Sequence, residues 1–238
     1  MNENQPIEGN PLRKDIERMI KEKDYKGLLF KAGELHGHFC NYLAYGVIAG
    51  CVAVKQLDVK NTGMEEVIAI CETNNCFSDG VQMITGCSFG NNALIYKDVG
   101  KTAFTLTKRD GEGIRIILDP DFENSREEEY PEAYRLWNKL IVAGEQGSPE
   151  EYGKMMHLFH EMSLKEINKP IDKIFKIQKV KVDLPPASVM LPWVKCSICS
   201  ENVMENKARV KNGETICLSC ANEQKYILDS KGISIELS

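Results

Sequence analysis

The chain has 238 residues, of which 42% are hydrophobic and 27% are charged, and this composition excludes the disordered and fibrous classes of protein. Its length allows one sizeable hydrophobic core and a small additional domain. Its formal charge of −5 argues against a protein whose main task is to bind phosphate backbones, so we expect no nucleic-acid partner.

The N-terminal part of the sequence predicts two helices. Residues 11–35 show apolar residues at helical intervals, with Asn10 as a cap, Pro11 in the first turn and an interruption near Gly27. Residues 41–56 are apolar on almost every side and rich in alanine and glycine. Such a helix is typically buried, and its small residues allow another element to approach closely.

The middle of the chain predicts strands around one short helix. The β-branched run 67–70 is typical of a buried strand, and residues 78–86 predict a helix that ends at a glycine. Residues 93–120 predict a meander of two or three strands, with turns at Gly100, Gly111 and Gly113.

The following segment returns to helix before a last strand of the core. Residues 121–166 predict helices with a break at 147–149, and residues 175–184 alternate apolar and polar positions as a strand with one solvated face does. Three prolines then mark 185–194 as a linker. We therefore predict an α+β core domain over residues 1–184, with an antiparallel-rich sheet packed by helices, and a small domain over 195–238.

Four cysteines of the small domain have the spacing of a zinc site. They read C-x₂-C-x₁₇-C-x₂-C, which folds two knuckles around one tetrahedral Zn²⁺ ion and leaves no open position for a substrate; they are Cys196, Cys199, Cys217 and Cys220. From Lys195 onward six basic residues balance six acidic ones, so this domain is neutral. We interpret it as a docking element rather than a nucleic-acid reader, although Lys207, Arg209 and Lys211 form a short basic stretch.

A second group of possible ligands precedes the apolar helix. His36, His38 and Cys40 lie within five residues, and a thiol at a helix N-terminus favours the thiolate that binds metals or attacks electrophiles. The alternative is that each histidine satisfies a local backbone partner and that Cys40 is a small buried group. Clustering favours a site, because imidazole and thiolate together suit zinc and related transition metals.

Cys76 and Asp79 stand three residues apart at the expected start of the short helix, at a strand end of the kind that often borders a crevice. Asp79 either shares a face with Cys76 or caps the helix. The other candidates are more readily structural; they are Cys51, Cys71, Cys87, His157 and His160.

Several ordered motifs resemble one known family. They are HGHFC, E-x₃-C-x₂-D-x₂-Q from Glu72 to Gln82, TGCSFGN from Thr85 to Asn91, and DVGK-x-AF from Asp98 to Phe104. Together they look like the E-subunit family of formylmethanofuran dehydrogenase over roughly residues 28–120. Tyr42 stands where a glycine is expected, and Asn91 stands where a lysine is common.

The resemblance implies an α+β core domain, an intertwined homodimer and, in some members, a C-terminal treble-clef zinc finger. It also implies an association with molybdenum or tungsten enzyme systems in anaerobic microbes. The matching positions would form a core site of one of two kinds. One kind binds a metal ion in addition to the zinc, through His36, His38, Cys40 and Cys76. The other kind is a catalytic group of Cys40, Cys76 and Asp79.

We therefore expect a metal-binding auxiliary protein that handles metal, performs thiol chemistry or assists maturation of such an enzyme. Two alternatives stay open. One is a zinc-finger regulator or adaptor that senses a ligand or metal and binds a protein or nucleic-acid partner. The other is an enzyme with Cys40 or Cys76 as nucleophile and a histidine as base.

The expected compartment is the cytoplasm. The first residues lack the apolar core of a signal peptide, and no run approaches eighteen apolar residues. Nine cysteines in a reducing compartment indicate metal ligands, redox groups or small buried side chains rather than disulfides.

Overall fold

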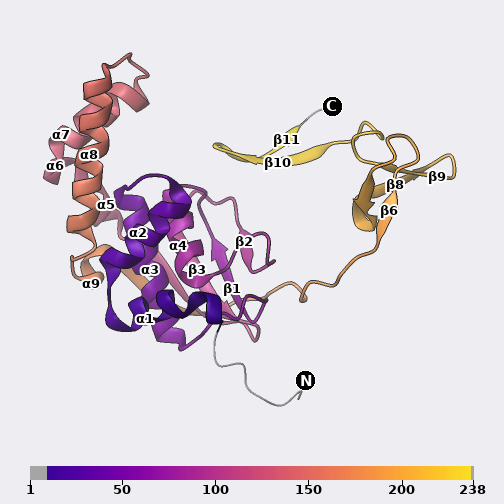
Figure 1. Cartoon of the computed structure of the whole chain (residues 1–238), viewed down its shortest axis with the longest axis horizontal. Helices are drawn as coiled ribbons and strands as arrows, with labels where there is room; N and C mark the ends of the chain where they lie inside the picture. Colours follow the sequence, from indigo (N-terminus) through magenta and orange to yellow (C-terminus); the bar gives the residue numbers. More distant parts are fainter. Residues whose placement is uncertain (1–9, 237–238) are drawn as a thin grey trace. The chain divides into compact units, whose positions relative to one another are not determined.

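The computed structural model describes residues 10–236 and divides the chain into two compact units (Figure 1). We call Met1–Pro185 the core unit and Pro186–Ser238 the C-terminal unit. Within the described residues no helix is both long enough and apolar enough to span a bilayer.

The core unit contains one mixed, mainly antiparallel sheet in the order β2-β1-β3-β4-β5. Only the β1–β2 pair is parallel. The strands are β1 Val67–Cys71, β2 Leu94–Tyr96, β3 Ala103–Lys108, β4 Glu112–Leu118 and β5 Phe175–Lys181. This arrangement confirms the α+β class and the antiparallel-rich sheet.

The predicted meander is correct only for β3 and β4. The helix between β1 and β2 carries the chain back to the edge of the sheet where β1 begins. The strand β2 therefore pairs in parallel with β1, and it is not a neighbour of β3. Gly111 adopts a positive φ of 87° in the β3–β4 turn, whereas Gly113 lies inside β4 opposite Thr107.

Helices cover the sheet on the side seen in Figure 1, where α3 contacts β3 and β4 and α4 contacts β1. A 3₁₀ turn, Pro11–Arg13, leads into them; the helices are α1 Lys14–Glu22, α2 Tyr25–His36, α3 Asn41–Leu57 and α4 Cys76–Thr85. The predicted cap is present, because the Asn10 side chain accepts a hydrogen bond from the Leu12 N–H. The helix break lies at Lys23, with a φ of 60°, and not at Gly27. Asp24 caps α2 by accepting from the Gly27 N–H, which places Gly27 in the first helical turn.

The helices α3 and α4 pack with almost no space between their backbones. A Cβ atom on Gly46 would lie 2.1 Å from the Phe77 carbonyl oxygen, and one on Gly80 would lie 2.5 Å from the Leu43 carbonyl oxygen. The small residues of the apolar helix therefore serve the close approach that the sequence predicts.

A helical hairpin extends from the core unit and has its own small apolar core. Ser148 and Glu151 form a capping box at the start of its long helix, beside the predicted break. The segment comprises α5 Pro120–Asn124, α6 Arg126–Glu129, α7 Pro131–Trp137, a π-helical turn Asn138–Val142, α8 Pro149–Glu166 and α9 Ile171–Ile174.

The buried carboxylate of Glu166 joins the base of this hairpin to α3. One oxygen accepts from the Arg126 guanidinium and from the Tyr130 hydroxyl, both at 2.8 Å, and the other accepts from the Tyr45 hydroxyl at 3.1 Å. Because the side chain of Glu166 is fully buried, these donors compensate a charge that would otherwise be costly.

Replacing Tyr45 with phenylalanine should lower the free energy of unfolding by about 2 kcal/mol, since it leaves a buried carboxylate oxygen without its donor. Urea unfolding followed by far-UV circular dichroism measures this change. Tyr96→Phe is the matched control, because its hydroxyl donates to Asp98 in an exposed setting and should cost less than about 0.5 kcal/mol. Equal losses in the two variants would contradict the importance of the Glu166 network.

The C-terminal unit consists of three antiparallel hairpins and a 3₁₀ turn, Glu205–Lys207, with no α-helix among residues 186–236. After the second cysteine pair the chain therefore continues into a hairpin of two strands and not into a helix. The strands are β6 Trp193–Lys195, β7 Asn202–Met204, β8 Ala208–Lys211, β9 Glu214–Cys217, β10 Lys225–Asp229 and β11 Gly232–Glu236. This unit has the small size and the cysteine cluster that the sequence predicts for a zinc-finger domain.

Candidate metal centres

The ends of three helices bring His36, His38, Cys40 and Cys76 together. His36 is the last residue of α2, Cys40 is the N-cap of α3, and Cys76 is the first residue of α4. Gly37 ends α2 with a φ of 87°, which turns the chain so that His38 faces the same space. One donor atom of each of the four side chains lies within 4.8 Å of the others.

Asp79 fixes the orientation of His36. Its Oδ2 atom lies 2.7 Å from His36 Nδ1, while its Oδ1 atom accepts from Gln82 Nε2 at 3.0 Å. The cap of α4 is Asn75, so the interpretation of Asp79 as a helix cap is wrong. A proton on Nδ1 leaves the lone pair on Nε2, and this buried atom has no hydrogen-bond partner among the described residues.

The electrostatics of the cluster favour a thiolate at Cys76. A hydrogen bond from the Cys40 thiol, and the positive charge that His36 and His38 carry when they are protonated, lower the pKa of Cys76 to about 5, although burial opposes this shift. The same hydrogen bond and burial raise the pKa of Cys40. The two thiols therefore titrate as a coupled pair, in which Cys76 loses its proton more readily than Cys40.

These residues fit a transition metal ion. Two imidazoles and two sulfur atoms form a ligand set of zinc and related metals. The unpaired Nε2 atom of His36 needs a partner, which a bound cation provides. A carboxylate on the opposite ring nitrogen is the usual second contact of a metal-binding histidine.

The other sequence candidates lie outside this cluster. Cys51, Cys71 and Cys87 are buried in the hydrophobic core. His157 is exposed and lies 3.5 Å from Glu161, while the ring of His160 stacks on Phe39 with 4.6 Å between centroids.

The two residues that depart from the family pattern both form hydrogen bonds within the core unit. The hydroxyl of Tyr42 donates to Glu123 at 2.6 Å, and Asn91 accepts from the Ser88 and Ala93 N–H groups. Within the motifs, Glu72, the residue after β1, forms a two-pronged ion pair with Arg115 of β4, at 2.6 and 2.7 Å, and thereby joins the end of β1 to β4.

The four cysteines of the C-terminal unit form a second cluster, with their sulfur atoms within 4.8 Å of one another; they are Cys196, Cys199, Cys217 and Cys220. The Cys217 N–H donates to the Cys196 sulfur and the Cys220 N–H to the Cys217 sulfur, both at 3.4 Å. The backbone N–H groups of Cys199 and Cys217 lower the pKa of Cys196 to about 6, which favours a thiolate ligand.

Two of the three basic residues in the stretch Lys207, Arg209 and Lys211 already have partners within the C-terminal unit. Arg209 pairs with Glu223 at 2.6 Å, and the Lys211 ammonium donates to the Ala221 carbonyl at 2.7 Å. These contacts leave fewer free cations for a phosphate backbone.

Residues 35–176 match the family described as FmdE, Molybdenum formylmethanofuran dehydrogenase operon. The chain belongs to the FmdE family. The match includes the whole core cluster and extends beyond the motifs that carry the resemblance in the sequence.

Two relatives of this FmdE-family chain show how far the similarity extends. A probable S-adenosyl-L-methionine-binding protein of Archaeoglobus fulgidus is 38% identical over 211 residues, which are 87% of this chain and 55% of that protein. This chain therefore spans about half the length of that relative. A solved structure of an FmdE-like protein of the tungsten formylmethanofuran dehydrogenase type from Syntrophus aciditrophicus is 25% identical, with a TM-score of 0.52 over 83% of this chain and 91% of the other.

Proposed function

We propose that this FmdE-family protein is a metal-binding auxiliary protein of molybdenum or tungsten enzyme systems. Its core cluster would bind one transition metal ion through His36, His38, Cys40 and Cys76. The observation that carries the proposal is the buried, unpaired Nε2 atom of His36 beside two sulfur atoms, with Nδ1 held by Asp79. The family and the tungsten-linked relative support the enzyme system.

The ligand set favours holding an ion over activating a substrate. Four protein ligands complete a tetrahedral shell, whereas catalytic zinc sites keep one position for water or substrate. Thiolate and imidazole select zinc and other borderline or soft cations rather than magnesium or calcium.

Metal analysis of the full chain, purified without oxygen, tests this proposal. We expect about two ions per chain and about one in a Cys40→Ser/Cys76→Ser variant. A Cys196→Ser/Cys199→Ser variant should keep the core ion, and Cys51→Ala, which removes a buried thiol outside both clusters, should keep both. A core variant with unchanged metal content, or a single ion lost entirely with Cys196, would overturn the core site.

Replacing Asp79 with asparagine should weaken metal binding at the core cluster about tenfold or more, because the neutral amide lacks the negative charge that orients the His36 ring. Competition with a chromophoric chelator measures the affinity. Asp110→Asn removes an exposed carboxylate in the β3–β4 turn and should leave the affinity unchanged. Equal affinities in Asp79→Asn and the native protein would exclude the orienting role of Asp79.

Thiol chemistry is a second candidate function, favoured by the lowered pKa of the partly exposed Cys76. Metal-free protein should then be alkylated by iodoacetamide first at Cys76. Bound metal should suppress that reaction, and slow alkylation of Cys76 in both forms would remove this candidate.

We also propose that the C-terminal unit is a docking element and that the chain forms a homodimer. Apolar side chains of this unit are exposed, among them Trp193 at 65% and Tyr226 at 73%.

The proposed homodimer is tested by sedimentation equilibrium, which should give twice the chain mass of 26.8 kDa. A monomeric mass at all concentrations would exclude the dimer.

A further inference from the structure

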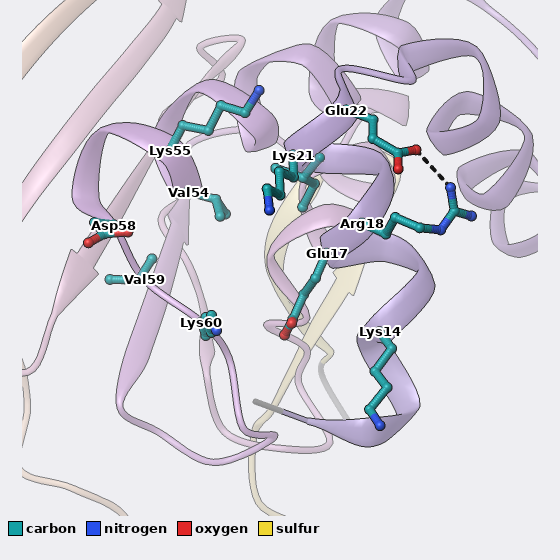
Figure 2. A pocket seen from close by; sticks show the side chains of 11 residues that line it. Lys14, Glu17, Arg18, Lys21, Glu22, Val54, Lys55, Asp58, Val59 and Lys60 are labelled. Carbon is teal, nitrogen blue, oxygen red and sulfur yellow. Dashed lines mark hydrogen bonds and ion pairs between the residues drawn. The ribbon is translucent and has the colours of Figure 1, made fainter. Parts of the chain in front are cut away.

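A groove on the core unit lies between α1 and the C-terminal end of α3, far from the metal cluster. It has a volume of about 820 Å³ and an apolar floor that includes Ile20, Val54 and Val59. Lysines surround it (Figure 2), and we call it the lysine groove after Lys14, Lys21, Lys55 and Lys60.

The fold does not use these lysines for pairing. Among residues 10–236 none of the four has an ion-pair partner, whereas the neighbouring Arg18 pairs with Glu22 at 2.8 Å. Lys21 and Lys55 lie in the last turns of their helices, where a cation is favourable. Lys14, however, begins α1, where the helix dipole disfavours a cation, so helix stability does not account for it.

The basic surface continues past the end of α3. Gln56 and Leu57, in the same last turn, line a second hollow of about 500 Å³ together with Lys108, Lys179 and Lys181. The linings of the two hollows together contain eight basic and four acidic residues, Asp58 and Glu112 among the latter, whereas the whole chain carries a charge of −5, so this excess of cations is local. A surface of this kind is complementary to an acidic partner.

Glu17 shows which kind of acidic partner fits. Its carboxylate lies in the lysine groove (Figure 2), and its Oε1 atom is buried without a hydrogen-bond partner among the described residues. A phosphate group brings further negative charge and no strong donor. A peptide brings carboxylates for the lysines, N–H donors for Glu17 and apolar side chains for the floor.

We propose that the lysine groove binds an acidic peptide segment of a partner protein, in which carboxylates alternate with aliphatic side chains. The groove is a separate site from the metal cluster. Cys40 caps the N-terminus of α3 and Lys55 lies near its C-terminus, so about 22 Å of helix separates them. Groove variants therefore keep their metal content, and the test is independent of the proposed core site.

Fluorescence anisotropy of the full chain with a labelled synthetic peptide of alternating glutamate and leucine tests the proposal. We expect saturable binding that weakens as salt is raised, and a loss of about tenfold or more in Lys21→Glu/Lys55→Glu. Lys165→Glu/Lys173→Glu makes the same change of charge at the ends of two other helices and should bind nearly as well as the native chain. Equal losses in the two variants, or no binding by the native chain, would overturn the proposal.

A Glu17→Gln variant separates a peptide from a phosphate ligand. Loss of the charge-assisted hydrogen bond should weaken peptide binding about threefold or more, whereas loss of a repulsive charge would tighten binding of tripolyphosphate or a DNA duplex. Tighter peptide binding by this variant, or native binding of duplex DNA as strong as that of the peptide, would contradict the assignment. Unchanged metal content and thermal unfolding in each variant show that the fold is intact.

Discussion

Replacing Gly80 with alanine should destabilise the core unit by about 3 kcal/mol and release the ion that we propose for the core cluster. A Cβ atom there would lie 2.5 Å from the Leu43 carbonyl oxygen and 2.7 Å from the Val47 nitrogen. Both are backbone atoms of α3, so no side-chain rotation relieves the contact, and α4 has to move away from α3. The intrinsic helix preference of alanine returns only about 1 kcal/mol.

The same movement reaches the metal cluster. The helix α4 begins at Cys76 and carries Asp79 one turn later, while Cys40 lies at the start of α3. Separating the two helices therefore separates two of the four proposed ligands and shifts the group that orients His36. Binding geometry is sensitive to displacements of this size, because thiolate bonds to zinc are about 2.3 Å long.

Gly153→Ala is the matched control, since Gly153 also lies inside a helix but a Cβ atom there meets no atom within 4 Å. This variant should keep its metal and gain up to about 1 kcal/mol. Urea unfolding and metal analysis of the two proteins measure both effects. A Gly80→Ala protein as stable as the Gly153→Ala protein, with its metal retained, would show that α3 and α4 tolerate separation.

Local patterns in the sequence account for most elements of the core unit. The apolar run before Leu57 predicts a buried helix, and the β-branched run from Val67 predicts a buried strand, because each pattern fills one short segment. The parallel pairing of β1 with β2 depends on the path of the intervening helix, which no pattern within either strand records. The helix break lies at Lys23 and not at the glycine, because a cap at Asp24 is compatible with a glycine three residues later.

The candidate site shows the same division between local and distant information. Spacing alone groups His36, His38 and Cys40, and the structure adds Cys76 from the start of α4, as expected; their role as ligands stays a prediction. The contact between His36 and Asp79 joins residues 43 positions apart. The only sequence signal for it is that Asp79 follows Cys76 by one helical turn, so both side chains lie on one face of α4.

The C-terminal unit should depend on its metal ion for folding, unlike the core unit. Among residues 186–236 its apolar core comprises only three buried residues, Cys196, Ile216 and Ala221, and its strands are three to five residues long. Isolated short hairpins with so little buried surface are marginal in water. Structural zinc sites contribute on the order of 10 kcal/mol to such domains, which exceeds any packing that this unit offers.

Replacing Cys196 with serine should therefore unfold residues 193–236 while the core unit stays folded. Hydrogen exchange measured by mass spectrometry should show rapid exchange in peptides from this segment and native protection in the strands of the core sheet, which rest on a large apolar core. Cys76→Ser is the reciprocal control, because it removes one proposed ligand of the core cluster and should leave protection at residues 193–236 unchanged. Native protection of that segment in Cys196→Ser would mean that the hairpins fold without the metal, and that the four cysteines are not what holds the C-terminal unit together.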